Sequence, residues 1–389
     1  MGQKSSRNLR LFAYVVAVAA LAAALWYGRT RTAADIEGPI HEIFPGATTL
    51  VLERGVYQVF DESERPVGWA ATGSASGYGG PMVLVTGIDT LGEVVDIRVV
   101  EQRETPIFWR MVKVPEFLAT LRGQSYDEVT YDIDDVDWVT GATISLGAIV
   151  TSTHASVVKV AGEAFDVRLP APPRSFEFGL LEIVVLMLLL TGVLVHRLRG
   201  PNRHRLRWAA QVTGLVVLGF WKDSPITLAK IAALLSGYFP DPRTSVALYL
   251  LLAGFAVTSM LFGRNVYCLY ACPFGAAQRV VGIIGGKGIK LPGWTIRFME
   301  AVRGVIVFAA LFLAFLTLTP TLASYEPFAA LFSLRGTTLQ WLLLFLVMVA
   351  SLMIATPWCN LFCPMRTIEI ALQDVKRGVR RSKGALADE

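Results

Sequence analysis

Cysteine is scarce in this chain, with four among 389 residues and none before residue 268. The first two thirds of the chain therefore have no disulfide available, and a domain folded there depends on its hydrophobic core. Histidine is equally rare, with four residues, and no two of them are placed to face each other across helices. A b-type haem is not indicated, and we interpret His196 and His204, which lie in a basic connection, as solvated side chains.

Charged residues are also few, at 17% against 53% hydrophobic residues, a balance too apolar for a purely soluble protein. Residues 29–175 contain 12 Lys or Arg against 21 Asp or Glu, so this stretch carries −9 and the rest of the chain +14. The basic residues flank apolar runs, and aromatic and basic residues do not alternate as they do along a nucleic-acid groove. Nucleic acid is therefore not an expected partner.

Apolar runs recur along the chain and predict a multi-pass membrane protein. There are six, at residues 11–25, 178–196, 208–221, 245–262, 302–319 and 338–356. Trp26 and Tyr27 close the first run as interfacial anchors, and a cleaved signal peptide is the alternative interpretation. The third run is short for a span, and the topology after it would reverse if it did not cross.

Basic residues in the short connections set the orientation, because Lys and Arg concentrate on the cytoplasmic side. They place both termini and the connections 197–207 and 264–297 inside. We therefore expect a membrane α-helical bundle of about six transmembrane helices, with an α+β extracytoplasmic domain inserted between the first and the second. The expected parts are an N-terminus and anchor (1–28), the outer domain (29–174), a five-helix membrane module (175–365) and a basic cytoplasmic tail (366–389).

The outer domain shows signals for both strands and helices. Runs at 82–88 and 94–100 have strand character and flank a turn at 89–92. A helical segment at 115–121 and an acidic stretch follow, and then a long helix is predicted at 143–163. Pro170, Pro172 and Pro173 form a stiff linker to the second membrane helix.

The segment Asp137-Trp-Val-Thr140-Gly141-Ala142-Thr143 precedes this long helix. A phosphate at Thr143 would meet free backbone N–H groups and the positive end of the helix dipole. Gly141 and Ala142 leave room for a large group to approach the Thr143 hydroxyl. For an isolated motif of this kind, the plainer interpretation is an N-cap made by Thr140.

Other motifs accompany this segment in a fixed order: Gly77-Tyr78-Gly79-Gly80, the turn with Gly92, and Glu104-Thr105-Pro106. Together they resemble the FMN-binding domain shared by the NqrC and RnfG subunits of ion-pumping redox complexes and by NosR-type proteins, over about residues 65–165. The resemblance implies FMN attached by a phosphoester to Thr143, installed outside the cytoplasm by a flavin transferase of the ApbE type. It also implies that Asp137 belongs to the transferase recognition signature.

Within this resemblance, the cofactor-binding candidates are Gly77, Tyr78, Glu104, Thr105, Asp137, Thr140, Gly141, Ala142 and Thr143. The sequence departs from the pump subunits after Pro106, where Ile107-Phe108-Trp109 replaces a glycine-rich continuation. Trp109 either stacks on the flavin or fills the core.

All four cysteines fall in two copies of one pattern, Cys268-x-x-x-Cys272-Pro and Cys359-x-x-x-Cys363-Pro, each at the inner end of an apolar run. The i, i+4 spacing puts both thiols of a pair on one helical face. Disulfides do not persist in the cytoplasm, so four convergent thiolates favour a metal site over packing. Tetrahedral sulfur suits zinc or iron–sulfur, and iron is favoured beside a flavin. The spacing leaves the cluster type open.

The paired C-x-x-x-C-P motifs resemble the membrane modules of NapH, NosR and RdhC, over about residues 176–375. The whole arrangement is similar to the NosR/NirI/RdhC group, without the eight-cysteine ferredoxin domain of NosR. The resemblance implies electron transfer through the iron–sulfur site and FMN to a periplasmic reductase or carrier, in a bacterial inner membrane, with a quinone as a further candidate cofactor. The alternatives are a redox sensor or maturation factor and a structural zinc protein. Glu182, early in the second membrane helix, is an additional candidate because a carboxylate near the apolar zone is costly, with interfacial solvation as the alternative. Glu326, in the outer loop, is a candidate to line a quinol or partner site, with an acidic turn as the plainer interpretation.

Overall fold

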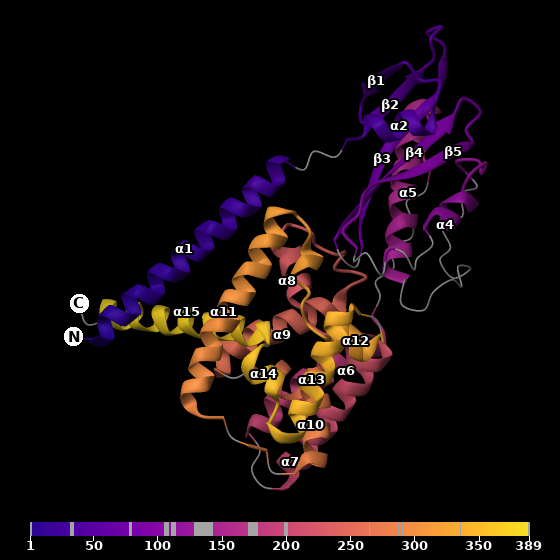
Figure 1. The fold of residues 1–389 in the computed structure, drawn as a ribbon. Coiled ribbons are helices and arrows are strands. Elements are labelled where there is room, and N and C mark those ends of the chain that lie inside the picture. The colour runs from indigo at the N-terminus through magenta and orange to yellow at the C-terminus, as the bar shows by residue number, and fades with distance from the viewer. Residues whose placement is uncertain are drawn as a thin grey trace. The chain divides into compact units, whose positions relative to one another are not determined.

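The computed structural model describes residues 2–31, 35–77, 80–104, 109, 114–127, 143–169, 178–197, 201–263, 265–286, 288–289, 291–334 and 336–387. Contacts divide the chain into two compact units (Figure 1). The first contains residues 1–174 with the short segments 233–240 and 314–321, and the second contains the remainder.

The first unit is built on one antiparallel sheet in which each strand pairs with its neighbour in sequence. The strands are β1 (Thr49–Glu53), β2 (Val56–Phe60), β3 (Pro66–Ser76), β4 (Pro81–Asp89) and β5 (Val94–Glu101). Its helices are α1 (Gly2–Arg31), α2 (Glu37–Ile43), α4 (Val114–Thr120) and α5 (Thr143–Ala164).

Helices cover both faces of this sheet, so both faces are apolar. On one face α5 packs along β3 and β4, with Met82, Leu84, Ile149 and Val157 buried between them. On the other face α2 packs against β4 and β5, and its core includes Ile40, Ile43, Phe44, Val59, Ala70 and Val85. The alternation of side chains along a strand supplies one core from each face.

The predicted strands at 82–88 and 94–100 correspond to β4 and β5, which pair in antiparallel register. Asp89 closes the turn between them, since its carboxylate accepts hydrogen bonds from the backbone N–H groups of Leu91 and Glu93. The predicted long helix corresponds to α5. The FMN-binding part is therefore a β-sheet domain with helices.

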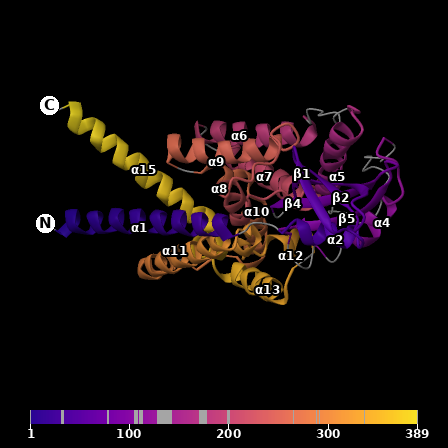
Figure 2. The same ribbon diagram turned by 90° about the horizontal axis from the view of Figure 1, so that it is seen from above.

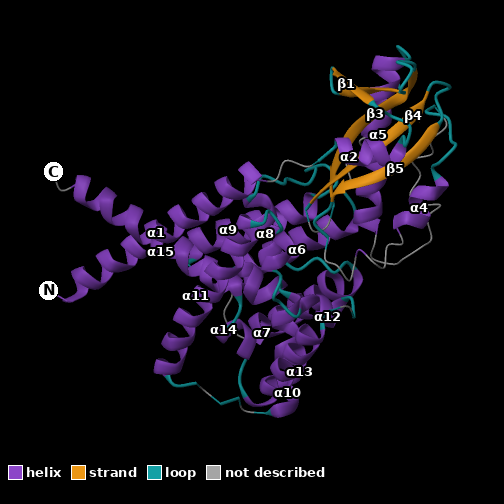
Figure 3. Cartoon of the chain, turned by 45° about the horizontal axis from the view of Figure 1, so that its top comes forward, coloured by secondary structure: helices purple, strands orange, loops and turns teal. Residues whose placement is uncertain are grey.

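Helices account for all the regular elements of the second unit that the structure describes, whereas every strand lies in the first (Figure 3). They are α6 (Leu180–Arg197), α7 (Pro201–Thr213), η1 (Gly214–Trp221), α8 (Leu228–Leu235), α9 (Val246–Phe262), η2 (Tyr267–Ala271), α10 (Pro273–Gly285), α11 (Gly293–Leu316), η3 (Pro320–Ala323), α12 (Phe328–Phe332), α13 (Thr338–Met353), α14 (Pro357–Leu361) and α15 (Pro364–Ala387). Of these, α11 continues into the first unit from residue 314. The first unit also contains the start of η3 and the end of α8. Figure 2 shows α6 and α9 side by side, and α10 packs against both α13 and η1.

Each of the six apolar runs forms a helix. Within the part of the chain that the structure describes, two helices are long and apolar enough to qualify as candidate membrane spans. These are residues 13–31 within α1 and the whole of α11. Shorter apolar helices occupy 180–195, 246–262 and 338–353. The run at 208–221 is part of a longer helical stretch, because α7 continues without a break into the π-helical η1 and the two together span residues 201–221.

Candidate functional site

The long helix of the flavin-binding domain begins at Thr143. The first N–H groups of a helix have no intrahelical partner, and such groups favour a bound phosphate. Tyr78, Thr105, Asp137, Thr140, Gly141 and Ala142 lie outside the described residues, as does the side chain of Thr143.

Gly77 and Glu104, from two different sequence motifs, lie against each other. A Cβ built on Gly77 would stand 2.5 Å from a carboxylate oxygen of Glu104, so no side chain fits between them. Glu104 is buried, and the Gly77 N–H donates to the carbonyl of Gly80 at 2.8 Å, which closes the glycine turn. The glycine motif and the Glu104 motif, which are separate in the sequence, therefore lie side by side in the folded domain.

Trp109 is half-buried and packs against the hydrophobic core on the α5 side of the sheet. Core filling is thus one established role of this side chain. Glu182 is buried at the start of α6, where its carboxylate accepts the N–H of Gly179 at 2.8 Å. This contact is a helix cap, in which an acid of the first turn reaches back to a backbone N–H before the helix.

The two cysteine motifs fold as short helical turns followed by a new helix. Cys268 lies within the π-helical η2, and Cys272 has an extended backbone with ψ 115°. Pro273 then begins α10, and Pro364 begins α15 directly after Cys363. The expectation that each thiol pair shares one continuous helical face is wrong, because the residue before a proline is pushed out of the helical region.

The second cysteine of each motif stands directly before a new helix. Cys272 is the N-cap residue of α10, and Cys363 directly precedes α15. The positive end of a helix dipole favours a thiolate. The proline in each motif therefore brings the second cysteine next to a helix N-terminus.

The four thiols gather in one region of the bundle. A Cβ on Gly275 would stand 3.8 Å from the sulfur of Cys272 and 3.7 Å from that of Cys359, so Gly275 leaves space between the motifs. Every pair of the four cysteines interacts electrostatically. Among the described residues, no three His, Cys, Asp or Glu side chains form a group suited to a single metal ion.

Two polar side chains in equivalent positions link the motifs, each six residues after the second cysteine of its own motif. Gln278 accepts the N–H of Trp358 at 2.9 Å and donates to the Cys359 sulfur at 3.4 Å. Glu369 accepts the N–H of Asn265 at 3.2 Å. The side chain of Asn265 in turn accepts the N–H of Cys268 at 3.1 Å.

Two arginines bring positive charge to the motifs. Arg303, in the middle of α11, is 2% exposed and donates to the carbonyl of Asn360 and the hydroxyl of Thr367, both at 3.0 Å. Arg279 donates to the carbonyl of Cys268 at 3.5 Å. These charges offset negative charge on four thiolates and any cluster they bind.

Aromatic side chains enclose the second motif. Trp358 is 1% exposed, and its neighbours include Phe274, Tyr325, Phe328 and Phe362 at ring separations between 5.9 and 6.3 Å. Tyr325 also donates its hydroxyl to the carbonyl of Phe362 at 3.0 Å. The sequence pattern gave no signal for this aromatic shell, since its members come from separate helices and one loop.

A buried acid lies near this shell. Glu326 is 2% exposed and accepts the N–H of Leu228 at 2.6 Å, which caps α8. Burial raises the pKa of Glu326 to about 7, against the opposing effects of backbone hydrogen bonds and the charge of Lys230. Burial likewise lowers the pKa of Lys230. Glu326 is therefore buried and is not part of a solvated acidic turn.

Known families match both regions. An FMN-binding domain family matches residues 77–157, from the glycine turn into α5. A 4Fe-4S binding domain family matches residues 244–292 and 338–381, which contain all four cysteines. The second match indicates a four-iron cluster, the type that the cysteine spacing had left open.

Curated relatives of the chain carry the NosR and NirI names. Regulatory protein NosR of Pseudomonas aeruginosa is 27% identical over 208 residues, which is 49% of this chain and 29% of the relative. Protein NirI of Paracoccus denitrificans is 28% identical over 221 residues, 50% of this chain and 32% of the relative. The chain is a NosR/NirI-type FMN-binding protein.

Another relative of this NosR/NirI-type protein is regulatory protein NosR of Stutzerimonas stutzeri, which is 25% identical over 210 residues. The matches span between 29% and 32% of the length of these curated relatives. The motif residues suit the two cofactors that the families imply. Thr143 starts a helix, and four thiols share one region with N–H donors and two arginines around them.

Proposed function

We propose that this chain is a multi-pass protein of the bacterial cytoplasmic membrane that passes electrons to a periplasmic acceptor through an iron–sulfur cluster and a covalently bound FMN. The observation that carries the proposal is the presence of both cofactor domains in one chain, with its only four cysteines inside the 4Fe-4S match. FMN exchanges one or two electrons, and an iron–sulfur cluster exchanges one. Together they would couple two-electron transfer to one-electron transfer.

Thr143 is the residue that would hold FMN through its hydroxyl, at the start of α5. Glu104 and Gly77, already in contact, would contribute to the flavin's surroundings. The other candidates for recognition and binding are Tyr78, Thr105, Asp137, Thr140, Gly141 and Ala142. Cys268, Cys272, Cys359 and Cys363 would hold the cluster.

The proposed topology has six spans, with residues 29–174 in the periplasm, the module 175–365 in the membrane and the tail 366–389 inside. A reporter fusion at about residue 285 should behave as cytoplasmic. Alkaline phosphatase activity from that fusion would refute the six-span topology.

The position of the thiols within the second unit supports a short electron path. Tyr325 and Phe328 come from the connection 321–336, which the topology places outside, yet they contact Phe362 and Phe274 beside the cysteines. Arg279, beside the first motif, lines a cavity with residues of the connection that the topology places inside. These contacts support a position of the cysteines deeper in the membrane than their basic flanks suggest.

The partners that this function requires follow from its chemistry. A flavin transferase of the ApbE type would attach the FMN, and a periplasmic reductase or electron carrier would accept electrons. A quinone in the surrounding lipid is the candidate donor, because it is the membrane-soluble two-electron carrier.

Inverted membrane vesicles provide the test, because the FMN domain then faces the lumen. Dithionite added outside, which crosses bilayers slowly, should bleach FMN absorbance faster in the wild type than in Cys268→Ser. Glu62→Gln, an exposed substitution in the outer domain that leaves all four cysteines intact, is the control and should behave as wild type. Equal bleaching in the wild type and Cys268→Ser would exclude an electron path through the cluster.

Equal bleaching would favour the second candidate, a redox sensor or maturation factor. Two of the relatives are named regulatory proteins, and this observation supports the second candidate. In that case the redox state of the cofactors would change the behaviour of a partner, and no net electron flow would be needed.

A further inference from the structure

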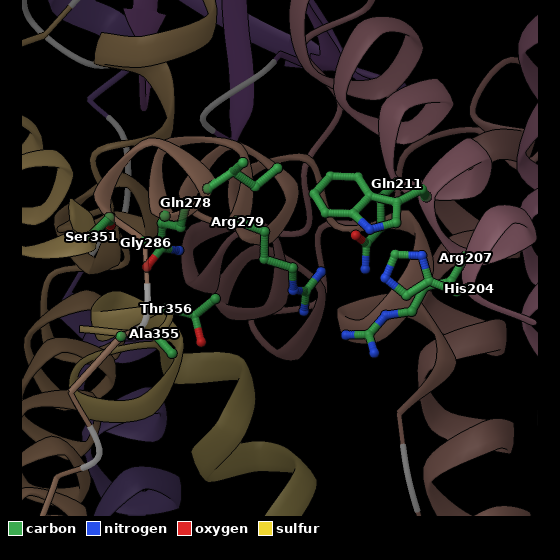
Figure 4. Close-up of a pocket in the computed structure, with 13 residues that line it drawn as sticks. His204, Arg207, Gln211, Gln278, Arg279, Gly286, Ser351, Ala355 and Thr356 are labelled. Carbon is green, nitrogen blue, oxygen red and sulfur yellow. The ribbon is translucent and has the colours of Figure 1, made fainter. Parts of the chain in front are cut away.

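A cavity of about 350 Å³ lies in the second unit between α7, α10 and the end of α13 (Figure 4). Its lining includes His204, Arg207, Gln211, Gln278, Arg279 and Thr356. The cavity reaches the cysteine motifs through Gln278 and Arg279, and neither cofactor accounts for its polar lining.

Two guanidinium groups face each other in this cavity. Figure 4 shows Arg207 and Arg279 extending from opposite walls toward its centre. Burial, and then the positive charges of Arg279 and Arg203, lower the pKa of Arg207 against the opposing effect of Tyr270. No Asp or Glu is among the described residues that line the cavity. The lining therefore carries positive charge that the protein itself does not balance there.

The buried amides in the lining are already engaged with the protein. Gln211 donates to the carbonyl of Leu269 at 2.8 Å, and Gln278 is bonded to Trp358 and Cys359. Both amides are nearly fully buried, at 2% and 0% exposed.

The guanidinium groups retain most of their donors. Arg207 makes no hydrogen bond or ion pair with the described part of the chain. Arg279 makes two long bonds, at 3.4 and 3.5 Å, to the carbonyls of Leu269 and Cys268. A guanidinium has five N–H donors, so both arginines have several free for a ligand.

We propose that this cavity binds a phosphate group, held between Arg207 and Arg279. Paired guanidiniums match the geometry and charge of phosphate, whereas a neutral carbonyl compound would leave two cations unbalanced. Two sources provide this group: the headgroup of an anionic lipid, suited to a basic pocket between membrane helices, and a soluble phosphate. Phosphate binding does not depend on the electron-transfer role, so the two are tested separately.

The test uses the full-length protein with its cofactors, purified in detergent and phosphate-free buffer. One arm titrates inorganic phosphate by calorimetry, and the other counts bound phosphatidylglycerol against phosphatidylcholine by native mass spectrometry. Arg207→Gln and Arg279→Gln should each weaken binding on the order of tenfold to a hundredfold, because each loses a charge-assisted interaction. Arg205→Gln is the matched control, since Arg205 is exposed on the same helix and does not line the cavity.

Binding of either probe that is lost in Arg207→Gln and kept in Arg205→Gln supports the site, and the probe that binds identifies the source. Arg279 also contacts the cysteine segment, so Arg207→Gln, which breaks no bond to the described chain, is the decisive variant if Arg279→Gln does not fold. Arg207→Lys should recover part of the affinity. Absence of binding in both arms, or equal binding by Arg207→Gln and the wild type, would overturn the proposal.

Discussion

Gln278 connects the two halves of the cysteine site through Trp358: its oxygen accepts the Trp358 N–H at 2.9 Å, and its nitrogen lies 3.4 Å from the neighbouring Cys359 sulfur. Gln278 belongs to the helix that follows the first motif, while Trp358 directly precedes the first cysteine of the second motif. The residue at the equivalent position after the second motif, Glu369, bonds in the reverse direction to Asn265 beside the first motif. The helix that follows each cysteine motif therefore bonds to the segment around the other motif.

The first prediction follows from this link. Gln278→Glu keeps an acceptor for Trp358 but replaces the donor to the Cys359 sulfur with a negative charge. The midpoint potential of the cluster should become more negative, since hydrogen bonds to sulfur and net charge both tune it. An EPR-monitored redox titration measures this shift. Gln58→Glu, on β2 of the outer domain, is the control. An unchanged potential in Gln278→Glu would contradict the assigned bond.

The second prediction concerns the buried Arg303. Arg303→Met leaves the carbonyl of Asn360 and the hydroxyl of Thr367 without their donor, at a cost of about 1–3 kcal/mol each. We expect a lower apparent unfolding temperature and loss of much of the bound iron. Arg297→Met, on the same helix and exposed, should change neither. Full iron and unchanged stability in Arg303→Met would show that Arg303 does not support the second motif.

The outer domain was largely predictable because its strand and helix signals are local. Strands β4 and β5, the turn at Asp89 and the start of α5 at Thr143 all agree with the sequence pattern. Strands β1 to β3 were not predicted. β1 is largely exposed, and β3 is rich in Ala, Gly and Ser, so neither shows the apolar alternation that indicates a half-buried strand.

The cysteine residues were identifiable from their repeated spacing, whereas their surroundings were not. The motifs are contacted by Gln278, Arg303 and Trp358. These contacts join residues that are far apart in the sequence, so no local sequence pattern predicts them. Spacing alone also gave the wrong local geometry, since it predicted one helical face where proline forces an extended residue. Glu326 is similar: its sequence suggests a solvated turn, and only the tertiary fold buries it.

The third prediction uses the raised pKa of Glu326. Its folded pKa of about 7 exceeds the ordinary value of 4.5, so the stability that Glu326 contributes is fully present below pH 4.5 and is lost as the pH rises to 7. The loss amounts to on the order of 3 kcal/mol. Glu326→Gln keeps the cap of α8 but does not titrate. Its unfolding temperature should therefore rise relative to that of the wild type as the pH increases from 4.5 to 7.

Thermal unfolding in detergent at pH 4.5, 6 and 7.5 measures this difference. The exposed Glu62→Gln provides a control that should follow the wild type at every pH. A constant difference between Glu326→Gln and the wild type across the three values would contradict the assigned titration.

The fourth prediction locates the flavin attachment. Thr143→Ala removes the hydroxyl proposed to form the ester, so the exported protein should lose its fluorescent band on a denaturing gel. Thr140→Ala should keep the band and lose only a cap, on the order of 1 kcal/mol of stability. If Thr143→Ala kept gel-stable FMN, or Thr140→Ala alone abolished it, the attachment site would be elsewhere.

The central claim is that one chain holds a covalent FMN and a four-thiolate iron–sulfur cluster. The most direct test measures iron, acid-labile sulfide and gel-stable FMN together on protein purified anaerobically after production with the flavin transferase. We predict four irons and four sulfides per chain, as a 4Fe-4S cluster requires, alongside one FMN. Cys268→Ser and Cys363→Ser should each lose most of the iron and keep the FMN. Full iron in both variants, or zinc in place of iron and sulfide in the wild type, would contradict the account.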